Sequence, residues 1–162
     1  MTQWLSQAQQ GDWRAFLSVT ALLPDQFSRD LQKTHGLTMA DYEILVRLSE
    51  APERAIRMSE LAVQTLATRS RLTHQIDRMV EEGLVERKPC TDDKRGFFAC
   101  MTEAGWQKLV AAAPDHVDSV RHHLVDVLTA DEFAQLGHIA RKILAGLDAE
   151  AQKKVVTNDC SA

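Results

Sequence analysis

No stretch of this sequence is apolar over the roughly 18 residues that a membrane-spanning helix needs. The first residues, MTQWLSQAQQGDWR, also lack the basic and then apolar order of a secretory signal peptide. We therefore expect no membrane segment and a cytoplasmic protein. With 7 glycines, 4 prolines and 44% hydrophobic residues in a chain of 162, the composition excludes a collagen, a low-complexity polymer and a fully disordered polypeptide.

Cysteine is scarce, and its spacing excludes the usual cysteine-based scaffolds. The three cysteines, at positions 90, 100 and 160, cannot all pair within one chain, and no CxxC or Cys/His ligand pattern occurs. His116, His122 and His123 lack the i,i+4 spacing of a helical metal site. We therefore expect no structural disulfide, no bound metal and no cofactor.

Catalytic signatures and an overall positive charge are missing as well. The sequence has no GxSxG elbow, P-loop, HExxH motif or dinucleotide fingerprint, which predicts that the protein is not an enzyme. Its formal net charge of -4 excludes a nucleic-acid binder that works by bulk charge. Any such site must be a local basic surface.

The sequence does contain a series of amphipathic helical segments, beginning near the N-terminus. Apolar residues recur at three- and four-residue steps over residues 4–33. Pro24 interrupts this run and predicts either a kink or the start of a second segment. Thr38 and Asp41 then form a capping box, which opens a helix ending near Ala51.

Helical patterns return in the last third of the chain. The first covers residues 102–129, with a bend expected near Pro114. Thr129 and Glu132 form a second capping box, which opens a final helix. After residue 148 the sequence becomes polar and we expect it to fray.

Between these helices lies the order helix, turn, helix and β-hairpin. Ser59 is expected to cap a short helix, and Thr68 a second one that ends at Gly83. Two β-prone runs follow, over residues 84–90 and 97–101, separated by a turn-rich segment. This order is that of a winged helix-turn-helix, whose second helix enters the DNA major groove.

The outward face of this second helix is basic. Residues 69–78 hold three arginines and one acid, and an apolar stripe of Leu72, Ile76, Met79 and Val80 would turn the polar residues outward. Arginine binds guanine O6 and N7, while serine, threonine and histidine reach base edges or phosphates. An ordinary solvated charged face is the alternative. The predicted DNA-binding residues of this helix are Thr68, Ser70, Arg71, Thr73, His74 and Arg78.

The hairpin tip, Asp92-Asp93-Lys94-Arg95-Gly96, supports this interpretation. A glycine after two cations would let Arg95 reach a narrow minor groove. Asp93 could orient Arg95, since a carboxylate beside a guanidinium restricts its rotamers. We therefore add Lys94 and Arg95 to the predicted DNA-binding residues, with an ordinary charged turn as the alternative.

Four segments, taken in order, resemble MarR-type transcription regulators. They are LTMADYEILVRLSEAP (37–52), RMSELA (57–62), SRLTHQIDRMVEEGLVERKPCTDDKRG (70–96) and MTEAG (101–105). The resemblance spans roughly residues 13–147. It implies a homodimeric DNA-binding regulator, more often a repressor, with terminal dimerisation helices. It also implies a small aromatic or lipophilic effector bound near the junction of the dimerisation and DNA-binding lobes.

The expected fold class is mainly α with a small β-hairpin wing: a winged helix-turn-helix flanked by N- and C-terminal dimerisation helices. The expected boundaries are an N-terminal helical segment (1–36), a DNA-binding lobe (37–101), C-terminal dimerisation helices (102–148) and a frayed tail (149–162). The terminal helices have no sheet to cover, which favours pairing with a second chain. A two-fold dimer sets its recognition helices ~34 Å apart on double-stranded DNA and predicts a palindromic operator.

Two kinds of switch are open on the sequence alone. The first is a pocket for a planar anionic ligand, with aromatic and apolar walls and polar anchors, built from Trp13, Phe16, Leu17, Tyr42, His35 and Arg47. The favoured alternative is simple packing of the first helix on the second.

The second switch is oxidation of Cys90 or Cys100, because cationic neighbours favour a thiolate. Here the favoured alternative is a small buried hydrophobe. A different class of function, a dimeric helical interaction module without DNA binding, predicts that Arg71→Ala and Arg95→Ala change nothing.

Overall fold

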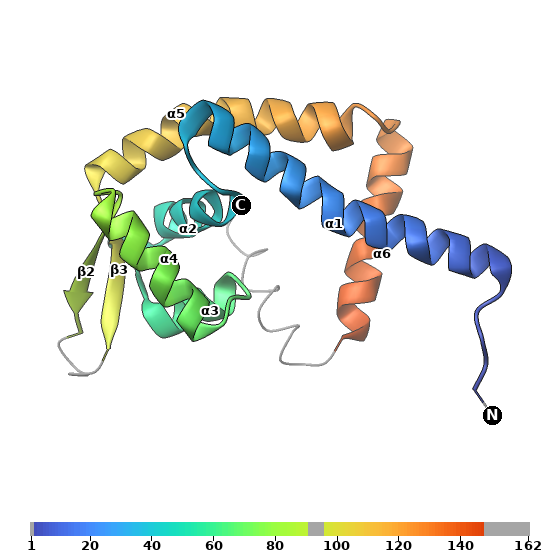
Figure 1. Cartoon of the computed structure of the whole chain (residues 1–162), viewed down its shortest axis with the longest axis horizontal. Coiled ribbons are helices and arrows are strands. Elements are labelled where there is room, and N and C mark those ends of the chain that lie inside the picture. Colours follow the sequence, from blue (N-terminus) through green and yellow to red (C-terminus); the bar gives the residue numbers. More distant parts are fainter. Residues whose placement is uncertain (1, 91–95, 148–162) are drawn as a thin grey trace.

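The computed structural model describes residues 2–90 and 96–147 and places a small antiparallel sheet at one end of a helical framework (Figure 1). In these residues the elements, in order, are α1 (Gln7–His35), α2 (Met39–Glu50), a 3-10 turn (Pro52–Arg54), β1 (Ala55–Arg57), α3 (Met58–Gln64), α4 (Arg69–Glu81), β2 (Val85–Pro89), β3 (Phe97–Met101), α5 (Glu103–Val120), a π-helical turn η2 (Arg121–Val125) and α6 (Ala130–Gly146). The expected class, mainly α with a small β wing, is confirmed.

The first helix is a single element. Ser6 and Gln9 form a capping box at its N-terminus, and Gly36 ends it in the left-handed conformation at φ 66°. Pro24 lies inside the helix, so the second segment offered as one outcome at Pro24 does not form. Proline removes only one backbone donor, and the rest of the 29-residue ladder continues on both sides of it.

The start of α2 follows the sequence prediction, whereas the start of α3 does not. The backbone N–H of Asp41 donates to Thr38 Oγ1 over 3.1 Å, and Thr38 N–H donates to Asp41 Oδ2 over 2.8 Å. The expected cap at Ser59 is wrong, because α3 already begins at Met58 and its N-cap residue, Arg57, makes no side-chain capping bond. Arg57 ends β1, a strand too short to be predicted from its own residues.

The hairpin is confirmed and gains a third strand. The sheet order is β1-β3-β2, and both pairings are antiparallel. Ala99 of β3 lies opposite Ile56 on one side and Arg87 on the other. A Cβ at Gly105 would lie 2.2 Å from the carbonyl oxygen of Leu84. Only glycine therefore lets α5 begin this close to the wing.

The C-terminal helices join differently from the sequence prediction. Pro114 lies inside α5, and the change of helix type comes later, at the π-helical turn η2. The capping box at Thr129 is confirmed: the backbone N–H of Glu132 donates to Thr129 Oγ1 over 3.3 Å, and the Glu132 carboxylate accepts from the Thr129 N–H over 2.8 Å. Polar pairs connect α1 to α5, among them the Ser119 hydroxyl, which donates to Asp30 Oδ2 over 2.5 Å.

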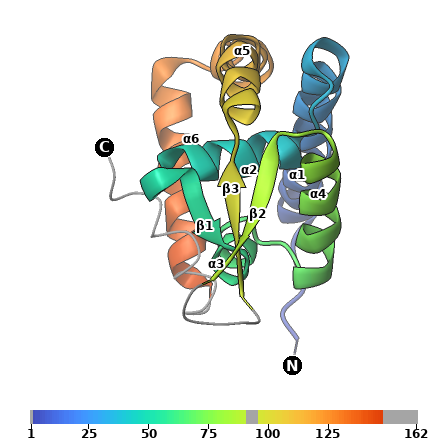
Figure 2. The same cartoon turned by 90° about the vertical axis from the view of Figure 1, so that its left-hand side faces the viewer.

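The core lies in the winged lobe rather than in the terminal helices. Its buried apolar residues come mostly from α2, α3, α4, the sheet and the first half of α5, and Leu31 is the buried residue of α1. In α6 no residue is buried, and its apolar face is exposed by 40% to 51% at Phe133, Leu136, Ile139 and Ile143. Helices α1 and α6 lie on either side of α5 (Figure 2). No helix in the described ranges is long and apolar enough to cross a membrane.

Candidate nucleic-acid interface

Helix α4 lies on the surface of the winged lobe, beside the hairpin (Figures 1 and 2). Thr68 caps it, since the Arg71 N–H donates to Thr68 Oγ1 over 3.3 Å. Leu72, Ile76 and Met79 are at most 2% exposed, so they fix the inward face of the helix. The fourth residue of the expected stripe, Val80, is 38% exposed and lies at the edge of that face.

The residues predicted to bind DNA on this helix are mostly accessible. Thr68, Ser70, Arg71, Thr73 and His74 are all exposed, and four of them line a shallow hollow on the outer face. In the described parts of the chain, Arg71 has no acidic partner. Its guanidinium is free to bind a ligand. Thr73 differs, because its hydroxyl donates to the Arg69 carbonyl oxygen over 2.8 Å.

Arg78 forms an ion pair within the protein that could not be predicted from the sequence. Its guanidinium pairs with Asp41, which is 0% exposed, and lies 3.6 Å from the Glu82 carboxylate. The hydrogen bond to Asp41 raises the pKa of Arg78. Gln75 also donates to Asp41. Arg78 therefore connects the recognition helix to α2, and its contact with DNA stays a prediction.

Arg87, which the sequence did not single out, connects the wing to α4. Its guanidinium pairs with Asp77 and donates to the Thr73 carbonyl oxygen over 3.2 Å. Asp77 is the one acid in residues 69–78, and helical periodicity places it on the outward side of α4, where a carboxylate would repel phosphate. Its pairing with Arg87 compensates that charge and fixes the angle between the hairpin and the helix.

The hairpin tip lies outside the described residues. Asp93, Lys94 and Arg95, the predicted wing contacts, belong to this segment. Their roles stay predictions.

The six residues proposed for an effector pocket are not brought into one cavity. Trp13 and His35 are 22 residues apart on the continuous helix α1, about 33 Å along its axis. Trp13 stacks on Phe16 at 6.0 Å, and both, with Leu17, are exposed by 45% to 49%. Tyr42, in contrast, is buried in the lobe.

The polar members of that set have partners elsewhere. His35 Nε2 lies 2.7 Å from an Asp115 carboxylate oxygen, and an Arg47 guanidinium nitrogen lies 3.5 Å from the Glu43 carboxylate. Burial raises the pKa of Tyr42. The first contact joins α1 to α5 and the second lies within α2, so the two polar groups do not converge on one ligand.

The two described cysteines are both free and buried. Cys100 pairs with Glu86 in the sheet register, and Cys90 lies four residues beyond Glu86, about 13 Å along the strand. That separation excludes a disulfide between them, because bonded cysteines have Cα atoms within about 7 Å. Burial also raises the pKa of Cys100, which disfavours the reactive thiolate. In the described part of the chain, no three or more metal-ligating side chains gather.

His116 makes the free energy of unfolding depend on pH. Its ring contacts Tyr42 at 4.4 Å and Phe27 at 5.8 Å, and Nδ1 has no hydrogen-bond partner among the described residues. Burial lowers the pKa of His116, so the folded chain binds the proton less readily than the unfolded chain. The free energy of unfolding must therefore fall as the pH drops below about 6.5, where an exposed histidine titrates.

We expect His116→Leu to reduce the loss of thermal stability between pH 7.5 and pH 5.5. His35 and His123 keep their Asp115 and Asp30 partners in the variant, so the comparison isolates His116. Melting curves at both pH values check this. An equal loss in both proteins would contradict it.

Comparison with known proteins defines the class. The fold and the exposed basic helix are those of a winged helix-turn-helix regulator, and the sequence profile of the MarR family matches residues 37–97. AbsC, a MarR family transcriptional regulator from Streptomyces coelicolor, is 46% identical; the match covers 88% of this chain and 95% of that one, with a TM-score of 0.81. Sco3205, of the same family and organism and solved in complex with DNA, is 40% identical over 91% and 92% of the two chains, with a TM-score of 0.87.

A curated relative agrees with these structures. The transcriptional repressor MprA of Escherichia coli strain K12 is 29% identical over 124 residues, which are 76% of this chain and 70% of the relative. The chain belongs to the MarR family.

Proposed function

We propose that this chain is a cytoplasmic, homodimeric transcription regulator that binds double-stranded operator DNA and acts as a repressor. The observation that carries the proposal is the Arg71 guanidinium on the exposed face of α4, beside Ser70 and His74, which has no acidic partner among the described residues. A helix with one buried stripe and a basic outer face is the element that winged helix-turn-helix proteins insert into the major groove.

The relatives support DNA as the ligand. Sco3205 was solved in complex with DNA, and MprA is named a transcriptional repressor. We assign the DNA-binding lobe to residues 37–101 and dimerisation to residues 1–36 and 102–148. The exposed apolar face of α6 favours this division, because a soluble monomer rarely exposes a long apolar row. A two-fold dimer would require a palindromic operator.

Two arginine replacements test DNA recognition. We expect Arg71→Ala to weaken binding to the operator by about 1 to 3 kcal/mol, the contribution of a bidentate base contact. We expect Arg95→Ala to weaken it as well, through loss of the minor-groove contact. Electrophoretic mobility shifts on the DNA upstream of the protein's own gene provide the measurement. Lys33→Ala, at an exposed position of α1, is the control. Unchanged affinity in both arginine variants would instead favour an interaction module without DNA binding.

We place the effector in a cavity between α1 and the DNA-binding lobe. Its volume is about 480 Å³, and its walls come from α1, α2 and α4, including Ser28, Ile44 and Arg71. This volume is in the range of small-molecule sites. A planar anion that bound Arg71 there would compete with DNA for the same guanidinium.

A panel of aromatic carboxylates tests this placement. At least one is expected to raise the melting temperature, as a ligand of the folded state must. The same compound should release the duplex, because it would occupy Arg71. Ala40 lies on the cavity wall, and we expect Ala40→Trp to remove the response while DNA binding persists. A panel that neither shifts melting nor releases DNA would contradict the effector site.

A further inference from the structure

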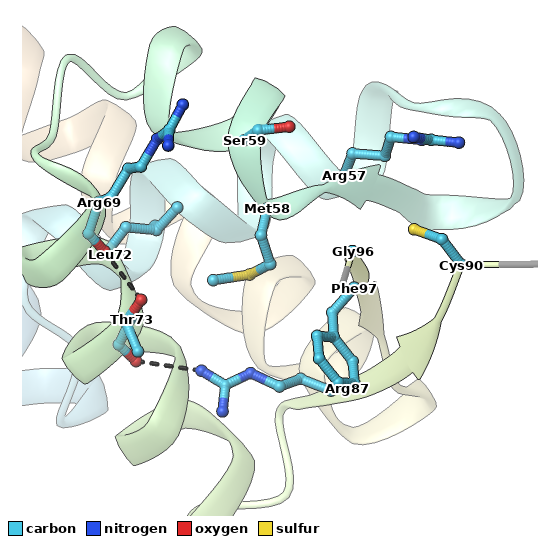
Figure 3. Close-up of a pocket in the computed structure, with 10 residues that line it drawn as sticks. All are labelled: Arg57, Met58, Ser59, Arg69, Leu72, Thr73, Arg87, Cys90, Gly96 and Phe97. Atoms are coloured by element: carbon cyan, nitrogen blue, oxygen red, sulfur yellow. Dashed lines mark hydrogen bonds between the residues drawn. The ribbon is translucent and has the colours of Figure 1, made fainter. Parts of the chain in front are cut away.

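A second basic site lies between α4 and the wing, apart from the face that the proposed function uses. It is a cavity of about 520 Å³. Three arginines from three elements line it: Arg57 of β1, Arg69 of α4 and Arg87 of β2, together with the hydroxyls of Ser59 and Thr73 (Figure 3).

The charge of this cavity is largely uncompensated. Arg87 is paired with Asp77. Within residues 2–90 and 96–147, Arg57 and Arg69 have no carboxylate partner. The Arg57 guanidinium instead lies 5.4 Å from the ring centre of Phe98, which leaves its N–H edge open. Two guanidinium groups without a carboxylate partner in the described ranges, beside the Ser59 hydroxyl, favour an anionic ligand in a chain of net charge -4.

We propose that this cavity binds the sugar–phosphate strand of the duplex that separates the major groove from the neighbouring minor groove. The inference rests on the proposed function. If α4 lies in the major groove and the hairpin contacts the minor groove, one DNA strand must pass between α4 and the hairpin. The cavity is lined by α4 and by the described residues of the hairpin. Arg69 borders it from α4, and Arg57 borders it from β1, the strand that pairs with β3 (Figure 3).

Each arginine has a separate role in this arrangement. Arg87 positions the hairpin against α4 through Asp77 and Thr73. Arg57 and Arg69 contact phosphate oxygens, which carry no sequence information. The interface therefore includes a residue of β1, a strand that the sequence did not reveal.

The first experiment measures salt dependence. We expect Arg57→Ala and Arg69→Ala each to weaken binding by a similar factor on operator and on unrelated duplex. Each should also reduce the slope of log affinity against log salt by about 1. Lys33→Ala, which removes a charge from an exposed position of α1, should change neither quantity. Melting temperatures confirm that the variants fold.

The second experiment uses operator duplexes in which single phosphates are replaced by neutral methylphosphonates. At one position per half-site, the replacement should lower the affinity of the wild-type protein for the duplex. On that same duplex, Arg69→Ala should cause no further loss of affinity, as a double-mutant cycle requires for two groups in contact. A second position should behave in this way for Arg57→Ala.

The outcomes separate the two proposals. If the wild-type protein binds operator but both variants keep its affinity and salt slope, the cavity does not bind the strand, and the proposed function stands. A loss of affinity that is confined to the operator and absent on unrelated duplex would also overturn the proposed strand contact, since that is the behaviour of a base contact. If the wild-type protein binds no duplex, the proposed function itself fails.

Discussion

Leu136→Asp combined with Ile139→Asp is expected to convert the proposed dimer into a monomer and to lower operator affinity by about 100-fold or more. These side chains are 40% and 51% exposed on α6 and line a hollow of about 780 Å³ between α1, η2 and α6. In a dimer, both new carboxylates would be buried without partners. A monomer would then bind only one half-site. It would lose the additional affinity that a dimer gains from binding two half-sites at once.

Sedimentation and mobility shifts check this prediction on the same samples. The matched control is Ala134→Asp with His138→Asp, which adds two acids to the opposite face of the same helix. The control should remain a dimer and bind normally. A double variant at 136 and 139 that still sediments as a dimer would show that the apolar row of α6 is not the interface.

Asp41→Ala is expected to lower the free energy of unfolding by about 3 kcal/mol, near the lower end of the cost of breaking a buried ion pair. Asp41 is 0% exposed. Its carboxylate accepts from Thr38 N–H over 2.8 Å and from the Thr38 hydroxyl over 2.6 Å, and it pairs with Arg78. Alanine removes the carboxylate half of the capping box, the two bonds from Thr38, and keeps the bond from the residue 41 N–H to Thr38 Oγ1. It also leaves Arg78 without this partner, although the partly exposed guanidinium can gain water.

Thermal unfolding at one fixed protein concentration measures the effect, which corresponds to roughly 6 to 12 °C for a chain of this size. Asp41→Asn keeps the volume and one acceptor oxygen, so we expect a smaller loss. Equal stability of the alanine variant and the wild type would mean that the Arg78 and Thr38 contacts contribute nothing to folding.

The parts of the fold that follow local rules could be predicted from the sequence. Thr38 with Asp41, and Thr129 with Glu132, mark helix starts because the cap and its partner are only three residues apart. The hairpin could be predicted because the helical spacing of apolar residues gives way to two short β-prone runs separated by a turn. Strand β1 could not be predicted, since its three residues form a strand only through pairing with β3.

The candidate site divides in the same way. The position of Arg71 on the outer face follows from helical periodicity, which is local. The pairing of Arg78 with Asp41, and of Arg87 with Asp77, depends on how distant elements pack, and no spacing encodes it. The proposed effector residues failed to gather because Pro24 did not break α1. A continuous helix keeps Trp13 and His35 at opposite ends.

Dimethyl sulfate protection tests the central claim, that the outer face of α4 lies in the major groove. The reagent methylates guanine N7 in the major groove and adenine N3 in the minor groove. We predict two patches of protected guanine N7 about one helical turn apart, and loss of the protection nearest Arg71 in Arg71→Ala. Protection confined to adenine N3, with every guanine N7 still reactive, would contradict the claim.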